Sequence, residues 1–235
     1  MSSISDILIN GADGAKGTTG GNAPGVTPTT SANGKDGHKP WFEDYVPATN
    51  GQPGVNAVNG SDGGNATNGQ PGGYLVLKAM TLSLSTPLTV QSLGGTGGQG
   101  GQGGNGANGG NGGNAGHNNP YYYSGPATLG GKGGNGSNGG KAGIAGDGAH
   151  GGDVQVQYQN ANLPSPVDAR SSGGGAGNGA LSSSAGMGGR GGRNDTGATE
   201  PFAPWGNNGT GFTGNPGNPG KGSSNIVIQH ITSFI

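Results

Sequence analysis

The sequence predicts a non-α fold: a bundle, or sandwich, of about six antiparallel polyglycine II helices with a small β-structured base and aromatic distal loops. Glycine supplies 61 of the 235 residues and recurs with a period of three, whereas a helix repeats every 3.6 residues and a strand every two. Only 27% of the residues are hydrophobic and none is Cys, so neither a large apolar core nor disulfides can hold the chain together. A period of three belongs to the extended left-handed helix, which has no internal hydrogen bonds.

The run over residues 94–116, GGTGGQGGQGGNGANGGNGGNAG, shows this period most clearly. Two of every three positions are Gly or Ala, and the third is Thr, Gln or Asn. Because most positions on two of the three ridges lack a Cβ, neighbouring backbones can approach closely enough to exchange N–H to O=C hydrogen bonds. We therefore expect the backbone itself to form the interior of the fold.

The same period predicts six helical runs within a single domain over residues 1–235. Runs 94–116 and 130–152 are equally long, about 70 Å at roughly 3.1 Å per residue, and should pair as a hairpin. The run over 51–72 keeps only one small ridge and is expected at an edge, and the last run has a phase slip before Gly211. The six runs span residues 11–25, 51–72, 94–116, 130–152, 173–192 and 206–222.

The segments between the runs alternate between two kinds. Four stretches are β-like, as shown by the apolar alternation of Val154, Val156 and Tyr158 with glutamines; they cover residues 1–10, 73–93, 153–170 and 223–235. Three loops are rich in Pro and aromatic residues and cover residues 34–50, 117–129 and 193–205. If consecutive runs alternate in direction, the β-like stretches gather at one end as a base and the three loops gather at the other as a tip.

Large aromatic side chains on loops held by a rigid scaffold are typical of recognition surfaces, because they supply contact area at low entropic cost. The alternative is that these rings pack on one another and cap the ends of the glycine runs. The candidate receptor-binding residues are Trp41, Phe42, Tyr45, Tyr121, Tyr122, Tyr123, Phe202 and Trp205.

The remaining chemistry argues against an enzyme, a cofactor or a metal site. Asp147, His150 and Asp153 share the third ridge, but successive positions on it lie roughly 9 Å apart, too far to share one ion, so a solvated ridge is expected. The net charge of −1 does not favour nucleic acid as a partner. No apolar run of about 20 residues predicts membrane insertion. The start, MSSISDILIN, has no secretory signal, so synthesis in a cytoplasm is expected.

The motifs GGTGGQGGQGGNG, GGKGGNGSNGG and GGGAGNGA, with the loops between them, resemble the tail-fibre tip adhesins of T-even-like bacteriophages. The resemblance covers residues 11–222. It implies a layered polyglycine II sandwich on a virion, in which loops 34–50, 117–129 and 193–205 bind a bacterial outer-surface receptor, either a protein or a glycan. It also implies attachment to the tail fibre or to another virion protein, and we expect the β base of this chain to make that attachment.

Two other functions remain open from the sequence. The chain could be a structural subunit of a filament or surface layer that assembles through its β base, where SNIVIQHITSFI suits strand addition. Ice binding is the least favoured, because it requires a flat array of Thr or small apolar residues, whereas the third ridges carry Asn, Gln, Lys and Asp.

Overall fold

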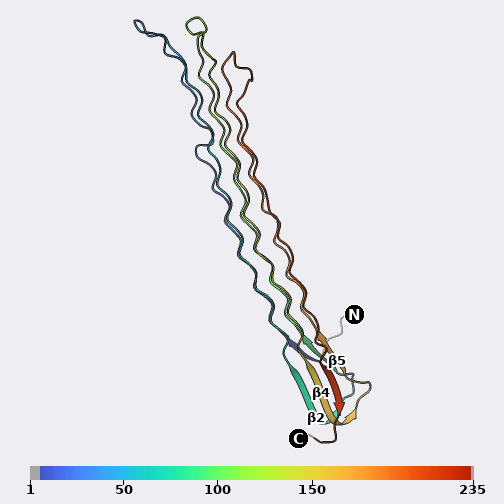
Figure 1. Cartoon of the computed structure of the whole chain (residues 1–235). Helices are drawn as coiled ribbons and strands as arrows, with labels where there is room; N and C mark the ends of the chain where they lie inside the picture. The colour runs from blue at the N-terminus through green and yellow to red at the C-terminus, as the bar shows by residue number, and fades with distance from the viewer. Residues whose placement is uncertain (1–5, 234–235) are drawn as a thin grey trace.

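The computed structural model describes residues 6–233 and has strands but no helix among them, which confirms the non-α class. Expectations for residues 1–5 and 234–235 lie outside the described residues. The strands gather at one end of a long, narrow molecule (Figure 1). Six strands are formed: β1 (Ile7–Asn10), β2 (Leu75–Ser83), β3 (Thr89–Leu93), β4 (Val154–Asn162), β5 (Asp168–Ser172) and β6 (Ile226–His230).

The strands form two three-stranded sheets, in the orders β1-β3-β5 and β2-β4-β6, and all pairs are parallel. The parallel arrangement follows from the long connections between paired strands. Between any two paired strands the chain runs out along the shaft and back, so it enters the second strand in the same direction as the first. Leu75, Val90, Val154 and Val156 are buried in one apolar cluster contributed by both sheets. The small hydrophobic content of the chain is thus concentrated at the base.

Each departure from the base is a long extended segment, and each return is another (Figure 1). We call residues 11–37, 94–117 and 173–193 the outward segments, residues 51–72, 130–152 and 203–222 the return segments, and all six together the shaft. Neighbouring segments lie side by side along the shaft, with one interruption after residue 23. Consecutive segments of the chain therefore run in opposite directions.

Backbone hydrogen bonds connect the shaft at every third residue. Within the outward layer, Gly14 N–H donates to Thr96 O at 2.7 Å and Gly97 N–H donates to Gly175 O at 3.0 Å. In the return layer, the first segment likewise donates to the second, and the second donates to the third. Between the layers, Gly98 N–H donates to Thr67 O at 3.0 Å and Gly146 N–H donates to Gly98 O at 2.9 Å. Backbone groups thus bind in two directions, within a layer and across it.

The third ridge has a structural role that differs from the expected solvated ridge. Side-chain oxygens on this ridge accept the backbone N–H of the next segment in the same layer: Asn65 Oδ1 accepts from Ile144 at 2.9 Å. The three residues considered for a metal site do the same or bind nearby side chains. Asp147 accepts from Asn218 N–H at 2.7 Å, His150 Nδ1 from Lys221 N–H at 2.9 Å, and Asp153 from the Ser223 hydroxyl at 2.5 Å.

The first outward segment is longer than its glycine run. After residue 23 the regular pairing is interrupted over residues 24–28. It resumes when Asn111 N–H donates to Thr29 O at 2.8 Å and Ser31 N–H donates to Asn111 O at 2.9 Å. Two prolines in 24–28 have no N–H to donate, which explains the interruption. Gly34 N–H then donates to Asn114 O at 2.8 Å, so residues 34–37 of the expected first loop belong to the shaft.

The edges of the return layer carry the remaining irregularities. Residues 51–72 pair with a single neighbour in this layer, as expected for an edge. In the last return segment, the N–H of Asn207 binds a side chain 72 residues earlier in the sequence, whereas the N–H of Asn218 binds one 71 residues earlier. The phase slip therefore lies between these two residues. In return segment 130–152, the equivalent positions donate N–H groups to the last return segment. In the last return segment these positions are occupied by Pro216 and Pro219. Because proline has no N–H, this edge offers no donor there for a further segment.

Candidate functional site

Three loops lie at the far end of the shaft from the sheets (Figure 1). The first is a hairpin in which the backbones of His38 and Val46 exchange two hydrogen bonds of 2.9 Å each. Lys39 Nζ donates to the carbonyl oxygen of Glu43 across its turn. The hairpin presents Trp41 and Phe42, whose exposed fractions are 94% and 96%.

Tyr45 connects the first loop to the second. Its ring lies 6.1 Å from the ring of Tyr122 and 5.9 Å from that of Tyr123, measured between centroids. Its hydroxyl accepts the N–H of Asn119 at 3.0 Å. Asn118 Oδ1 accepts the N–H of Ala48, in the chain that leads out of the first loop, at 2.8 Å. These three tyrosines therefore contribute to holding two loops together, in line with the capping alternative.

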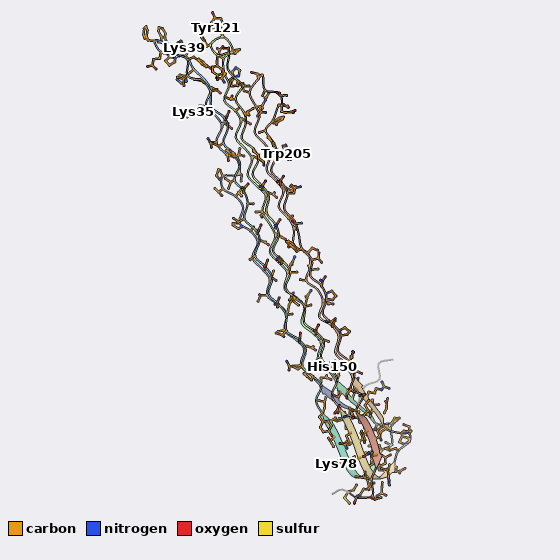
Figure 2. All side chains as sticks on the ribbon, viewed as in Figure 1. Lys35, Lys39, Lys78, Tyr121, His150 and Trp205 are labelled. Atoms are coloured by element: carbon orange, nitrogen blue, oxygen red, sulfur yellow. The ribbon has the colours of Figure 1, made fainter. Side chains whose placement is uncertain are left out.

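Tyr121 has a different environment from its two neighbours. Its ring contacts Tyr122 edge to face at 5.0 Å, and 85% of its surface is exposed (Figure 2). Tyr121 N–H donates to Asn119 Oδ1 at 2.9 Å, which fixes the turn that carries it. Tyr121 thus joins Trp41 and Phe42 as an aromatic side chain on a fixed loop with most of its area open.

The third loop is anchored to the second by Asp195, which sequence reasoning did not single out. Asp195 is almost buried; it accepts from Asn118 N–H at 3.0 Å and lies 2.7 Å from His117 Nδ1. Burial alone would raise the pKa of this carboxyl group. Hydrogen bonds from Asn118, His117 and Thr196, and the charge of His117, outweigh burial and hold the pKa below its ordinary value.

The structure divides the two aromatic candidates of the third loop. Phe202 pairs through its backbone with Arg193 and is exposed at the neck of this loop. Trp205 lies on the side of the shaft, well below Tyr121 and Lys39, and not with the distal group (Figure 2). The reason is that residues 203–205 already belong to the last return segment: Gly133 N–H donates to Pro204 O at 2.9 Å. The third loop therefore ends before Ala203, a few residues short of the expected boundary at 205.

Within residues 6–233 no helix is long and apolar enough to span a membrane. Across the same residues, no three His, Cys, Asp or Glu side chains are grouped so that they could hold a metal ion.

No protein-family model and no curated protein matches the chain. Among solved structures, a springtail antifreeze protein from Granisotoma rainieri, described as a bundle of nine polyproline type II helices, is similar at 24% identity. The match covers 83% of this chain and 97% of the antifreeze protein, with a TM-score of 0.12. A TM-score this low carries no argument about fold or function.

Proposed function

We propose that the protein is a tail-fibre tip adhesin that binds a bacterial outer-surface receptor through its distal loops, on a shaft of six polyglycine II helices. The observation that carries this proposal is the exposure of Trp41, Phe42 and Tyr121 on loops whose necks are fixed by hydrogen bonds. Most of their apolar area is open, and Tyr121 makes only an edge-to-face ring contact with Tyr122 among the described residues. Grouped exposed aromatics on a rigid support favour a binding surface.

The assignment of the shaft to polyglycine II helices rests on the three-residue spacing of its backbone hydrogen bonds. Gly54, Ala57, Gly60 and Gly63 donate in turn to the neighbouring return segment at 2.8 to 3.1 Å. A strand donates to one neighbour from alternate residues, whereas a three-fold helix presents an equivalent group every third residue. This spacing supports a fold in which such helices pack in two layers.

The capping alternative accounts for part of the tip only. It explains Tyr45, Tyr122 and Tyr123, whose rings pack together between two loops. Trp41 and Phe42 cover no shaft end, because they lie at the turn of the hairpin and are almost completely exposed. In this proposal the packed tyrosines support the loops, and the exposed rings contact the receptor. The base would join the tail fibre or another virion protein.

Inhibition of phage adsorption tests the proposal. Purified protein should block adsorption to a susceptible bacterium drawn from a panel, and a triple variant Trp41→Ala, Phe42→Ala, Tyr121→Ala should lose the block. Removing one interface anchor typically costs about 2 kcal/mol, on the order of 30-fold in affinity. Met80→Ala, at an exposed residue of the base, is the matched control and should block like the parent. A folded triple variant that still blocks would contradict the proposal.

A structural subunit remains the second candidate, and the observation that favours it is the edge strand β6. Its Ile226 and Ile228 are aligned with buried Val154 and Val156 of β4, yet both are exposed. Such an edge suits addition of another strand. Electron microscopy of the purified protein separates the candidates, because an adhesin should give discrete particles and a subunit should give ordered polymers.

A further inference from the structure

A lateral groove crosses the outward layer below the tip. We define it by Val26 and Thr29 on one wall, Asn108 and Asn111 on the floor, and Arg190 and Trp205 on the other wall. Its volume is about 700 Å³. The groove shares none of its lining residues with the distal aromatic group of Trp41, Phe42 and Tyr121, so it is a separate site.

The two walls exist because two segments depart from the regular shaft. On one side, residues 24–28 interrupt the regular pairing and carry Val26, and Thr29 follows where the pairing resumes, with its carbonyl oxygen accepting the Asn111 N–H at 2.8 Å. On the other side, Trp205 takes a position that is glycine in the neighbouring return segment, at Gly133. A shaft with unbroken glycine spacing would have neither wall.

The floor presents hydrogen-bond donors. Asn108 Oδ1 accepts the N–H of Met187 at 2.8 Å and Asn111 Oδ1 accepts the N–H of Arg190 at 2.9 Å. With its oxygen engaged by the backbone, each amide still has two N–H donors on Nδ2. The two residues are one period apart, roughly 9 Å, which suits a ligand with acceptors at regular intervals.

Arg190 and Trp205 give the groove charge and an apolar face. The Arg190 guanidinium lies 5.5 Å from the ring centroid of Trp205, and Trp205 is 59% exposed. Among the described residues Arg190 forms no ion pair, and no Asp or Glu lines the groove. A ligand here must therefore supply acceptors or negative charge to several donors, and an apolar surface to the indole.

We propose that the lateral groove binds an acidic oligosaccharide chain. Sugar rings combine an apolar face with regularly spaced oxygens, and a carboxylate on the chain would match the five donors of Arg190. A bare anion would use the guanidinium and leave the indole and one asparagine without a role. The inference concerns the side of the shaft and holds whether or not the tip binds a receptor.

Nuclear magnetic resonance titration of the full chain with a galacturonate hexamer tests the groove. The Trp205 indole N–H signal and the Nδ2 signals of Asn108 and Asn111 should shift together in a saturable way. The indole of Trp41, the only other tryptophan, reports on the tip: a shift at Trp41 without one at Trp205 would place the hexamer at the tip and overturn the groove assignment. A neutral galactose hexamer and inorganic phosphate are the comparison ligands, and each should bind at least about tenfold more weakly.

Asn108→Asp combined with Asn111→Asp gives the sharpest variant, because it keeps both Oδ1 acceptors and replaces the donors with negative charge. The shaft tolerates this change, since Asp62 fills the same role toward Lys141 at 2.7 Å. Affinity for the hexamer should fall at least tenfold in this variant. Arg190→Gln should cause a similar fall, because a tenfold loss corresponds to about one hydrogen bond to a charged group. Asn135→Asp with Asn138→Asp, on the return layer, is the matched control and should bind normally.

Several results would overturn this inference: absence of saturable shifts with the acidic hexamer, equal affinity for the neutral hexamer, or unchanged affinity in the folded double variant. Phosphate that binds as tightly as the hexamer would show an anion site in place of a saccharide site. These outcomes are independent of adsorption, which depends on the tip variants, so failure of one proposal can be told from failure of the other.

Discussion

Asn105, together with the glycine that follows it, binds both backbone polar groups of Ser184 on the adjacent outward segment. Its Oδ1 accepts the Ser184 N–H at 2.9 Å, and the next residue, Gly106, donates its N–H to Ser184 O at 2.8 Å. Together the side chain and the following N–H bind one residue at two points. Asn108 with Met187 and Asn111 with Arg190 repeat the arrangement.

This pairing explains the composition of the third ridge. Asparagine is useful where another segment follows in the same layer, because its oxygen then satisfies an N–H that the three-fold backbone would leave to water. The last outward segment has no such follower among the described residues. Its third positions accordingly include Leu181, Ser184, Met187 and Arg190.

Substitution of an inward glycine should be far more damaging than substitution of one on the third ridge. An added Cβ at Gly101 would fall on the carbonyl oxygen of Thr18, whereas at Gly175 its nearest neighbour would be Thr96 Cγ2 at 3.6 Å. We expect Gly101→Ala to lower the free energy of unfolding by about 3 kcal/mol or more, and Gly175→Ala by less than about 1 kcal/mol. Thermal unfolding monitored by circular dichroism measures both, and equal losses would contradict the packing.

Asn105→Val should destabilise less than a change at Gly101. The variant removes the acceptor of the Ser184 N–H, but this position is exposed and water can replace it, so we expect a loss of about 1 kcal/mol. Hydrogen exchange at the Ser184 amide should accelerate about fivefold or more. Asn105→Asp keeps the acceptor and should restore the slow exchange; if it exchanges as fast as the valine variant, the hydrogen bond is not responsible.

The link between the second and third loops should weaken in acid. Because the pKa of Asp195 is lower in the folded protein than in the unfolded chain, its contribution is fully present above about pH 4 and is lost as the pH falls through the lowered value. Protection of the Asn118 amide from exchange should therefore decline below about pH 4. Asp195→Asn should give weak protection that does not change in this range, and a parent protein with constant protection would count against the carboxylate.

Tyr45→Phe tests whether the packed tyrosines support the tip. The change keeps the ring contacts with Tyr122 and Tyr123 but removes the oxygen that accepts the Asn119 N–H at 3.0 Å. We expect a local loss of about 1 kcal/mol, seen as faster exchange at Asn119 with an unchanged midpoint of global unfolding. Tyr121→Phe is the control, and similar exchange rates in both variants would refute the assigned role of the Tyr45 hydroxyl.

The glycine period was enough to predict the non-α class, and together with the apolar alternation between the runs it predicted strands at one end of the molecule. Val154 and Val156 are strand residues buried between the sheets, as their alternation with glutamine indicates. The parallel order of the strands was not predicted, because it depends on which segments become neighbours after an excursion of more than 60 residues. Local patterns contain no information on such pairings.

The site was harder to predict than the fold for a similar reason. The aromatic content of a loop identifies candidates such as Trp41 and Phe42, but it does not distinguish an exposed ring from one, like Tyr45, that packs between loops. Trp205 was misplaced because the last glycine period begins before its first glycine, with Ala203 in a glycine position. Asp195 gave no signal, since a single carboxylate in a polar loop looks the same whether it is buried or solvated.

The two-point pairing of Asn105 and Gly106 with Ser184 also bears on chemical ageing. Asn-Gly is the dipeptide most prone to spontaneous deamidation in flexible chains, because the glycine nitrogen attacks the side-chain carbonyl carbon to form a cyclic imide. In the outward layer that nitrogen is occupied as a donor, and the side-chain oxygen is held by an N–H of the next segment. Asn108-Gly109 and Asn111-Gly112 are held in the same way. The hydrogen bonds that assemble the shaft thus also protect a sequence that, when unfolded, would be chemically short-lived.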